Sequence, residues 1–375
     1  MNICIIPWDY PDTLRPTYAF VKELVEQWGL MGGHSLTVVS PFSITKTKRW
    51  LRPAEISTSY PINIIRPRIA TLSNLRLFGR SVSREIVHWA VYNELCKLKQ
   101  KPDVIYCHFW EQAITAYRYA RENNIPIVVA CGESEIPKEW ALDPYRSMCN
   151  SVAHVVCVSI KNKREAISMG LTKEEKCSVH PNGIDGSIFR VSDQKELRKR
   201  MGANESDFVT AFTGWFVNRK GANRVSAAID SLNDPEIKSI FVGGKGEFGP
   251  TCQGIIFNGM LNHSEIPNYL NCADVFVLPT LKEGCCNAIV EAMACGLPII
   301  SSDKDFNEGL LDETNSILVD PESVDDIANA IKRIKNDTKL RCRLREGALA
   351  KAAQLTIRQR AMNIISELER VVNNN

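Results

Sequence analysis

The chain has 375 residues, of which 44% are hydrophobic, and a formal net charge of +3. At roughly 100 to 200 residues per domain, this length predicts two domains. The 13 cysteines occur singly, without CxxC pairs or metal-ligand spacing, which favours a reducing compartment over a disulfide framework. No apolar run approaches the roughly 18 residues of a membrane span, and the N-terminus lacks an export signal. We therefore expect a cytoplasmic protein.

Short runs rich in β-branched residues alternate with segments of helical periodicity in the first half of the chain. Apolar spacing predicts helices over 18–28 and 83–98. The strands expected between such helices are 2–6, 35–40, 62–65, 103–107, 125–130 and 154–159. This alternation is typical of βαβ units.

The pattern restarts after the segment HPNGIDGSIF (180–189), whose Pro, Asn and Gly residues predict a loop. A second set of strands is expected at 207–214, 237–244, 254–259, 273–280, 297–302 and 316–320. Residues 339–372 are helical in pattern and charged. The sequence therefore predicts an α/β protein with two doubly wound domains, 1–185 and 186–350, and a C-terminal helix, 351–375, that packs back towards the first domain.

The charge is unevenly distributed. Between Lys46 and Lys101 there are 12 basic and 3 acidic residues, with Trp50, Leu75, Leu77, Phe78 and Trp89 interleaved. Basic residues beside aromatic and aliphatic ones can hold a protein to an anionic membrane face. A solvated basic surface of an ordinary domain is the alternative interpretation.

The segment EGCCNAIVEAMACGLPII (283–300) places two glutamates among small and apolar residues. Glu283 follows an expected strand, and Glu291 lies inside the following helix, so the carboxylates should be roughly 10 Å apart. Ligands of open α/β sheets lie beyond the carboxyl ends of the strands, and with two such domains we expect the site in the cleft between them. The two acids then suit opposite parts of one extended ligand, with helix N–H groups between them. Alternatively, Glu283 is a first-turn acid favoured by the helix dipole and Glu291 is a solvated helix residue.

This segment resembles the Glu-x7-Glu signature of family four glycosyltransferases, E-G-x-P-N-x-x-x-E-A-M-A-C-G-x-P, with Cys286 in place of the proline. Further matching segments occur in the family's order: GHSLTVVSP (33–41), PDVIYCHFW (102–110), HPNGID (180–185), GWFVNRKG (214–221), FVGGKG (241–246), IFNGMLNHSEIPNYLNCADVFVLPT (256–280) and SILVDPES (316–323). The resemblance is weak between 42 and 100. It implies a GT-B fold and retaining transfer of a sugar from a nucleotide-diphosphate donor.

The resemblance also implies roles for individual residues. Glu283 would accept hydrogen bonds from the donor sugar, Glu291 from the nucleotide ribose, and Lys220 would bind phosphate. The family's arginine after Gly214 is replaced by Trp215, and Arg219 is the candidate substitute; a surface position is the alternative for both basic residues. The implied donor-binding set is Arg219, Lys220, Glu283, Gly284, Cys285, Cys286, Asn287 and Glu291.

The N-terminal half departs further from the family pattern. Many relatives have a histidine where this chain has Cys131, and we do not expect this cysteine to act as a nucleophile because no base is near it in sequence. Glu133, two residues on, is a candidate for orienting a hydroxyl. His108 matches a histidine common in the family, and a structural role is its alternative.

Other motifs predict no additional chemistry. The segment GGKGEFG (243–249) lacks the complete Walker pattern, and Asp303-Lys304-Asp305 follows the wrong strand for a metal-binding Asp-x-Asp. The basic segment 339–351 contains no aromatic residue and is interpreted as a solvated helix. We therefore expect no required metal, no cofactor other than the nucleotide-sugar substrate, and no nucleic-acid partner.

The resulting hypothesis is a metal-independent, retaining glycosyltransferase of bacterial surface polysaccharide or glycolipid biosynthesis. Its expected partners are a nucleotide sugar, a carbohydrate or lipid-linked oligosaccharide acceptor, and an anionic membrane surface at the inner face. Two alternatives are another GT-B enzyme, such as a nucleotide-sugar epimerase or a phosphorylase, and a non-catalytic nucleotide-sugar-binding protein.

Overall fold

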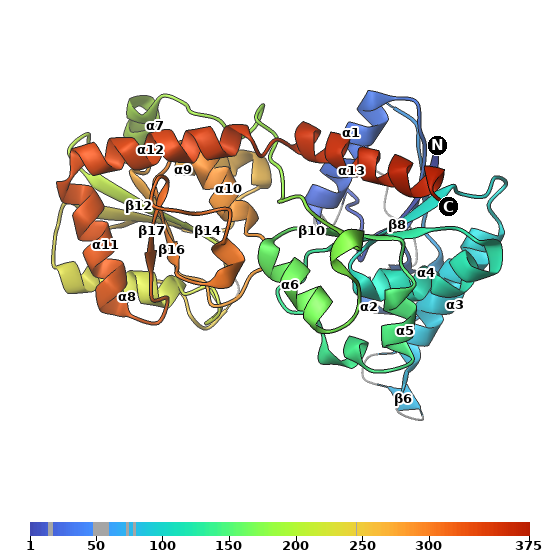
Figure 1. Ribbon diagram of the computed structural model, residues 1–375. Helices are drawn as coiled ribbons and strands as arrows, with labels where there is room; N and C mark the ends of the chain where they lie inside the picture. The colour runs from blue at the N-terminus through green and yellow to red at the C-terminus, as the bar shows by residue number, and fades with distance from the viewer. Residues whose placement is uncertain (14–17, 48–59, 73–74, 78–79, 245) are drawn as a thin grey trace. The chain divides into compact units, whose positions relative to one another are not determined.

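The computed structural model describes residues 1–13, 18–47, 60–72, 75–77, 80–244 and 246–375 (Figure 1). Within these residues the chain divides into two compact units. Unit 1 comprises residues 1–158, 162–180 and 360–375, and unit 2 comprises residues 159–161 and 181–359. Each unit is built around its own parallel β-sheet.

Unit 1 contains a seven-stranded sheet in the order β11-β10-β9-β8-β1-β2-β4. All neighbouring strands in it run parallel. Its strands are β1 (Asn2–Ile6), β2 (Ser35–Val39), β4 (Ile62–Ile65), β8 (Val104–His108), β9 (Ile127–Cys131), β10 (His154–Cys157) and β11 (Cys177–Val179). Two small sheets pair β3 (Phe42–Ser43) with β5 (Arg68–Ile69) and β6 (Arg76–Leu77) with β7 (Arg80–Ser81).

The helices of unit 1 are α1 (Ala19–Met31), α2 (Ile44–Thr47), α3 (Val82–Cys96), α4 (Trp110–Asn123), α5 (Tyr145–Asn150), α6 (Ile160–Ser168) and α13 (Ile357–Asn373), with 3₁₀ turns at Lys138–Ala141 and Glu174–Lys176. They include most of α6 and most of α13, the last helix of the chain, and the first residues of both helices are assigned to unit 2.

Unit 2 contains a six-stranded parallel sheet in the order β14-β13-β12-β15-β16-β17. Its strands are β12 (Phe208–Thr213), β13 (Ile237–Val242), β14 (Ile255–Gly259), β15 (Val275–Leu278), β16 (Ile299–Ser302) and β17 (Ser316–Val319). Its helices are α7 (Gln194–Met201), α8 (Ala222–Leu232), α9 (Ile266–Leu270), α10 (Asn287–Ala294), α11 (Val324–Asn336) and α12 (Thr338–Ala353), with 3₁₀ turns at His263–Glu265 and Asp305–Asn307.

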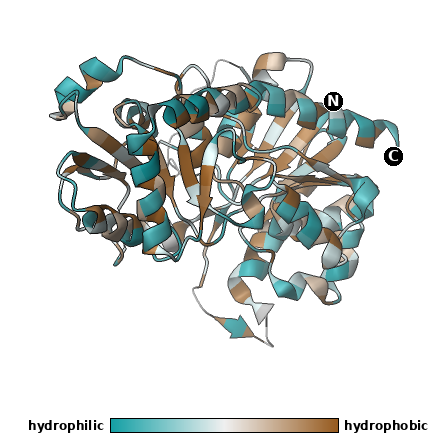
Figure 2. Ribbon diagram, turned by 60° about the vertical axis from the view of Figure 1, so that its left-hand side comes forward, coloured by the Kyte–Doolittle hydropathy of each residue, from teal (hydrophilic) through white to brown (hydrophobic). Residues whose placement is uncertain are grey.

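The predicted α/β class with two doubly wound sheets is confirmed, and each expected strand has a counterpart in the structure. The central strands are buried on both faces, as parallel strands covered by helices must be. Figure 2 shows the resulting distribution, with hydrophobic strands inside and helices that turn hydrophilic residues outward. Strand β11 and the two small sheets were not predicted, because runs of two or three residues carry little periodic signal.

The helical segment expected over 339–372 is broken into α12 and α13 by the loop 181–185. Ile184 lies in the break: its N–H donates to Leu355 O at 2.9 Å, and its carbonyl accepts from Ile357 N at 2.9 Å. Gly183 is required here because a Cβ at this position would lie 2.7 Å from the Ile357 Cα atom. The PNG segment therefore shapes the chain at the point where α13 begins.

Helix α13 is attached to unit 1 by polar contacts that include a buried histidine. Trp28 Nε1 of α1 donates to Ala361 O at 3.0 Å. His154 of β10 lies 2.9 Å from Ser178 Oγ through Nε2 and 3.1 Å from Arg370 Nη2 through Nδ1. Burial lowers the pKa of His154 to about 4, although Glu367 acts in the opposite direction. The folded state therefore favours the neutral ring.

This depressed pKa predicts acid sensitivity of unit 1. A histidine in the unfolded chain binds a proton near pH 6.5, whereas folded His154 does so near pH 4. Protonation therefore favours the unfolded chain, and the unfolding free energy falls as the pH is lowered from about 6.5 to about 4. In urea unfolding, His154→Gln should reduce the loss of unfolding free energy across this window by roughly 1–3 kcal/mol. The control is His263→Gln, on a more exposed histidine in unit 2; equal pH dependence of all three proteins would contradict the assignment.

Candidate functional site

Glu283 lies in the loop that connects β15 to α10, at the carboxyl edge of the unit 2 sheet. Its side chain is buried, and its Oε1 atom is 2.6 Å from Lys220 Nζ and 2.8 Å from Arg219 Nη1. Thr280 Oγ1 donates to the same oxygen at 2.8 Å. One carboxylate oxygen thus receives two cations and a hydroxyl.

The pairing determines the charge state of Lys220. Burial disfavours its ammonium group, yet the pKa of Lys220 is raised above its ordinary value. Cys286 stays a neutral thiol, because burial raises its pKa to about 12. The Glu283 carboxylate is therefore the group that keeps Lys220 protonated.

Backbone contacts bring the loop after β12 to the loop after β15. Lys220 N donates to Val217 O at 3.0 Å, and Leu281 N donates to Arg219 O at 2.8 Å. Gly221 directly precedes α8 and has a φ of +80°, and a Cβ atom at this position would lie 2.9 Å from Pro279 O. The Arg-Lys-Gly segment therefore has its glycine where no other residue fits without displacement.

Glu291 lies within α10 and has a different partner. Its side chain is buried, and its Oε1 atom is 3.0 Å from His263 Nε2. The ring of His263 packs against Phe189 at a centroid distance of 5.1 Å. The two glutamates therefore have different partners, Lys220 and Arg219 for Glu283 and His263 for Glu291.

The segment from Gly284 to Asn287 forms the entrance to α10. The helix begins at Asn287 after the extended Cys286, whose carbonyl accepts from Ile289 N at 3.1 Å. Asn182 Nδ2 donates to Asn287 Oδ1 at 2.7 Å and to Cys285 O at 3.4 Å. The loop 181–185 thereby holds the start of the helix.

Trp215 and Arg219 differ in their contacts with the site. The Trp215 side chain is 50% exposed and carries no charge to the site. Arg219 instead brings its guanidinium to Glu283 and also donates to Lys282 O at 2.5 Å. The second cation at this edge of the sheet thus comes from residue 219.

The two candidate residues of unit 1 lie at the carboxyl ends of β8 and β9, where His108 is buried and Glu133 is half-buried. His108 is buried against the Phe20 and Phe109 rings, at centroid distances of 5.3 and 4.6 Å, and burial lowers its pKa to about 3. Both Glu133 carboxylate oxygens accept backbone amides, from Trp110 at 2.8 Å and Gly132 at 3.0 Å. Burial is the main cause that raises the pKa of Glu133. In this conformation His108 is neutral and Glu133 supports the start of α4.

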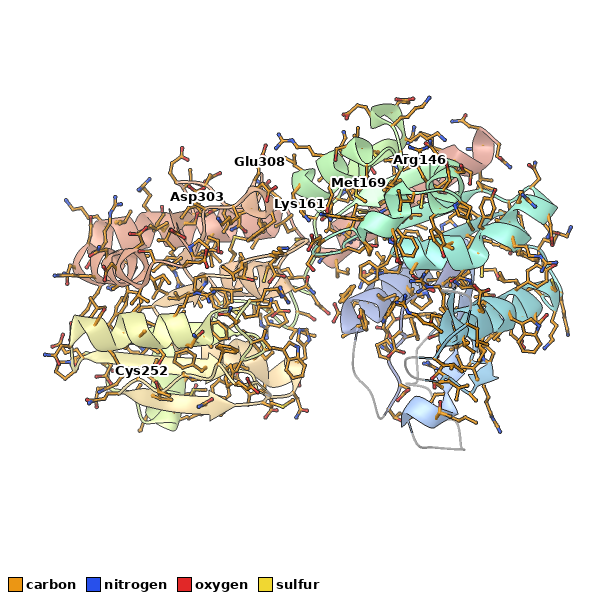
Figure 3. The ribbon with its side chains drawn as sticks, turned by 90° about the horizontal axis from the view of Figure 1, so that it is seen from below. Arg146, Lys161, Met169, Cys252, Asp303 and Glu308 are labelled. Carbon is orange, nitrogen blue, oxygen red and sulfur yellow. The ribbon has the colours of Figure 1, made fainter. Side chains whose placement is uncertain are left out.

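The Asp-Lys-Asp segment is exposed after β16, and Figure 3 labels Asp303 at the surface of unit 2. Among the described residues, no group of histidine, cysteine, aspartate and glutamate side chains is placed to hold a metal ion.

Three residues in contact with the predicted set were not singled out from the sequence. They are Thr280, Asn182 and His263, which contact Glu283, Asn287 and Glu291 respectively. Each occurs in a segment that matches the family, but the match alone assigns no partner to them. Their contacts connect positions up to 105 residues apart, so only the fold brings them together.

Two family models match the chain. "Glycosyltransferase Family 4" matches residues 18–187, and "Glycosyl transferases group 1" matches residues 193–351. Together they span both units of the chain. The chain belongs to the family four glycosyltransferases. The resemblance found in the Glu-x7-Glu segment is thereby confirmed, and the epimerase, phosphorylase and non-catalytic alternatives are not supported.

Relatives of this glycosyltransferase include TuaC of Bacillus subtilis (strain 168), provisionally named a teichuronic acid biosynthesis glycosyltransferase. It is 27% identical over 359 residues, 90% of each chain. A second is the Escherichia coli UDP-Gal:α-D-GlcNAc-diphosphoundecaprenol α-1,3-galactosyltransferase, 26% identical over 64% of this chain and 68% of its own.

Among solved structures, Anabaena HepE in complex with UDP-glucose has a TM-score of 0.73 at 17% identity, covering 99% of this chain and 100% of its own. This likeness supports the GT-B fold.

The Glu283 contacts predict strong coupling between residues 283 and 220. Glu283→Gln should lower the unfolding free energy of unit 2 by roughly 1–3 kcal/mol, because it leaves the buried Lys220 ammonium without its counter-charge. Adding Lys220→Met should recover part of this loss, as measured by urea denaturation in a double-mutant cycle. Glu308→Gln, on an exposed glutamate, is the control. Strictly additive effects of the two substitutions would show that the pair contributes nothing to stability.

Proposed function

We propose that the protein transfers a sugar from a nucleotide-diphosphate donor to a carbohydrate or lipid-linked acceptor with retention of anomeric configuration and without a required metal. The observation that carries the proposal is the arrangement of Lys220 and Arg219 around Glu283 at the carboxyl edge of the unit 2 sheet. The named donor and acceptor of the E. coli relative, a UDP sugar and a diphosphoundecaprenol-linked sugar, provide further support.

The two cations suit the charge that develops when the donor breaks. Cleavage of the bond between the anomeric carbon and the phosphate oxygen leaves negative charge on the nucleoside diphosphate, and fixed positive groups stabilise it. Lys220 and Arg219 would shift from Glu283 towards the diphosphate, which frees the carboxylate to accept hydrogen bonds from the donor sugar. Because these cations are built into the protein, the proposal assigns no charge-stabilising role to a metal.

The remaining residues of the set suit the rest of the donor. Glu291 would accept hydrogen bonds from the ribose, with His263 holding its carboxylate in place. The amides of Gly284 to Asn287 would face the donor's sugar and phosphates, in a loop that Asn182 positions.

Retention is proposed to result from reaction on one face of the sugar. The acceptor oxygen bonds to the anomeric carbon on the side from which the diphosphate departs, and the acceptor proton passes to the departing phosphate oxygen. This route requires no protein nucleophile. It is compatible with Glu133, whose carboxylate oxygens accept backbone amides, and with Cys131, which is fully buried.

A screen of UDP sugars with carbohydrate and lipid-linked acceptors tests the transfer reaction, with the product anomer assigned by NMR. Lys220→Ala should lower turnover by roughly 10² or more, as removal of a fixed stabiliser of developing charge does. Lys238→Ala, which removes a lysine at the start of β13, should leave turnover unchanged. A chelator should not reduce the wild-type rate.

Four results would contradict parts of this proposal. Inversion at the anomeric carbon would exclude the retaining route, and a rate lost to chelator and restored by Mg²⁺ or Mn²⁺ would exclude metal independence. Sugar altered without any acceptor would indicate an epimerase. Donor binding without turnover across the acceptor panel would indicate a binding protein.

We also propose that unit 1 attaches to an anionic membrane through the region around β6. The described side chains of Leu72, Leu75 and Leu77 are exposed there, and Trp89 of α3 is 68% exposed. Figure 1 shows β6 at one extremity of unit 1. Trp50 and Phe78, which also entered the prediction, lie outside the described residues. None of the described helices is long and apolar enough to cross a membrane.

The basic residues of the segment 46–101 differ in their exposure and in their partners. Arg66 is buried and donates to Tyr10 O and Pro11 O, and Arg84 pairs with Glu111 and Glu139. Arg68 and Arg76 are exposed, and Arg76 stands between Leu75 and Leu77 in the sequence. These two arginines, not Arg84, are therefore the cations to test.

Liposome co-sedimentation decides this membrane proposal. Binding should occur on anionic vesicles at low salt and fall as salt rises, because each basic residue contributes about 1 kcal/mol within a Debye length of about 8 Å. Changing Arg68 and Arg76 to Glu and Leu75 and Leu77 to Asp should abolish it. Lys99→Glu with Lys101→Glu, beyond the far end of α3, is the control. Equal recovery with neutral and anionic vesicles would refute membrane attachment.

A further inference from the structure

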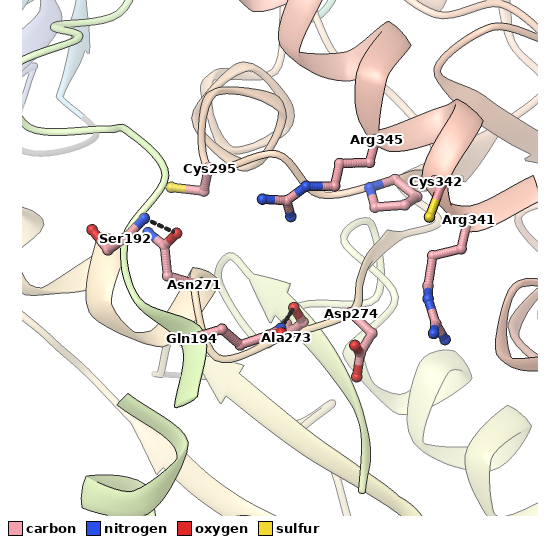
Figure 4. Close-up of a pocket in the computed structure, with 10 residues that line it drawn as sticks. Ser192, Gln194, Asn271, Ala273, Asp274, Cys295, Arg341, Cys342 and Arg345 are labelled. Carbon is pink, nitrogen blue, oxygen red and sulfur yellow. Dashed lines mark hydrogen bonds between the residues drawn. The ribbon is translucent and has the colours of Figure 1, made fainter. Parts of the chain in front are cut away.

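A pocket of roughly 250 Å³ lies at the amino-terminal edge of the unit 2 sheet (Figure 4). Asp274 and Pro298, the residues just before β15 and β16, line it together with residues of α12. Glu283 follows the opposite, carboxyl end of β15. This pocket is therefore separate from the candidate donor site.

The wall of the pocket is held by hydrogen bonds. Ser192 N donates to Asn271 Oδ1 at 2.8 Å, and Gln194 Nε2 donates to Ala273 O at 2.7 Å, as the dashed lines in Figure 4 show. Asn271 Nδ2 donates to Arg190 O at 3.0 Å. The cavity is therefore shaped before any ligand enters.

The charge of the lining is positive. Arg341 and Arg345 lie four residues apart on α12 and both line the pocket. The acid of the lining is Asp274, whose Oδ2 accepts from Arg198 Nη2 at 2.5 Å and from Val209 N at 2.7 Å. This carboxylate is already neutralised by a residue outside the lining.

Both lining arginines retain hydrogen-bonding capacity. Arg345 Nη1 donates to Gly296 O at 3.0 Å, and the Arg341 guanidinium lies over the Phe208 ring at 5.6 Å. Within the described part of the chain, neither arginine forms an ion pair. A guanidinium has five N–H donors, so most of this capacity remains for a ligand.

We propose that this pocket binds a small phosphate-class oxyanion through Arg341 and Arg345. The planar guanidinium fork matches phosphate oxygens in geometry and charge. Drug-sized ligands occupy pockets of roughly 300–1,000 Å³, so the smaller cavity suits inorganic phosphate or a small phosphate monoester, not a nucleotide sugar. The basic segment 339–351, interpreted from the sequence as a solvated helix, thus contributes two residues to a defined cavity.

Cys342 provides a local probe of occupancy. It lines the pocket and is exposed, and Cys96 is the other exposed cysteine among the described residues. In a Cys96→Ser background, alkylation of Cys342 by iodoacetamide can be followed by peptide mass spectrometry. Inorganic phosphate at ten times its dissociation constant should slow this alkylation by about tenfold, because about one pocket in eleven remains free. Chloride at matched ionic strength is the reference.

Single substitutions on α12 test which arginines bind the anion. Arg341→Gln and Arg345→Gln should each raise at least about tenfold the phosphate concentration that is needed to protect Cys342 to the same degree. This is the scale of a lost charge-assisted hydrogen bond. Arg343→Gln removes the same charge from the same helix, but Arg343 is exposed, donates to Glu313 O at 3.2 Å, and does not line the pocket. Phosphate should therefore protect Cys342 in the Arg343→Gln variant as well as it does in the parent protein. Circular dichroism in chloride verifies that each variant is folded.

A second measurement, the thermal midpoint, requires no substitution in the pocket. Phosphate should raise the thermal midpoint of the parent protein, and prior alkylation of Cys342 should abolish that shift. Comparing glucose 1-phosphate with inorganic phosphate distinguishes a monoester from the free ion. Equal slowing by chloride, or an equal loss of protection in the Arg343→Gln variant, would show a general ionic effect and overturn the proposal.

Discussion

The contact between Glu283 and Lys220 is the interaction on which the candidate donor site depends. Burial of either charge alone would be costly, so each requires the other at hydrogen-bond distance. The two residues are 63 positions apart and follow different strands. Their pairing therefore holds the loops after β12 and β15 in one arrangement. An anionic ligand at this edge must compete with Glu283 for both cations.

The order of strands in unit 2 brings Glu283 and Lys220 close enough to pair. β12 lies between β13 and β15, so the loops that leave the carboxyl ends of β12 and β15 are neighbours. The Arg-Lys-Gly turn connects these loops through Arg219 O, which accepts from Leu281 N, while Thr280 holds Glu283 within its own loop. Asn182 reaches the start of α10 from the segment that also contacts α13. Several separated parts of the chain thus converge at α10.

Helix α10 connects two chemically different environments. Its first turn and Glu291 belong to the candidate donor site. Just beyond its last turn, Cys295 lines the pocket that contains Arg341 and Arg345, and Gly296 O accepts from Arg345. The interior residues between them, Ile289, Val290 and Met293, are fully buried. The helix is therefore fixed by its packing, and its ends are free to carry different functions.

The sequence by itself determined the alternation of strands and helices, the α/β class and the Glu-x7-Glu segment, because periodicity, turn residues and motif spacing are local along the chain. Which residues meet was decided only by the tertiary structure. Thr280 on Glu283, His263 on Glu291 and the burial of Arg66 depend on strand order and loop packing. Charge counts along 46–101 likewise could not distinguish exposed Arg76 from paired Arg84, because pairing depends on elements distant in sequence. A contact between distant residues leaves no periodic trace in either segment, so the folded chain is needed to reveal it.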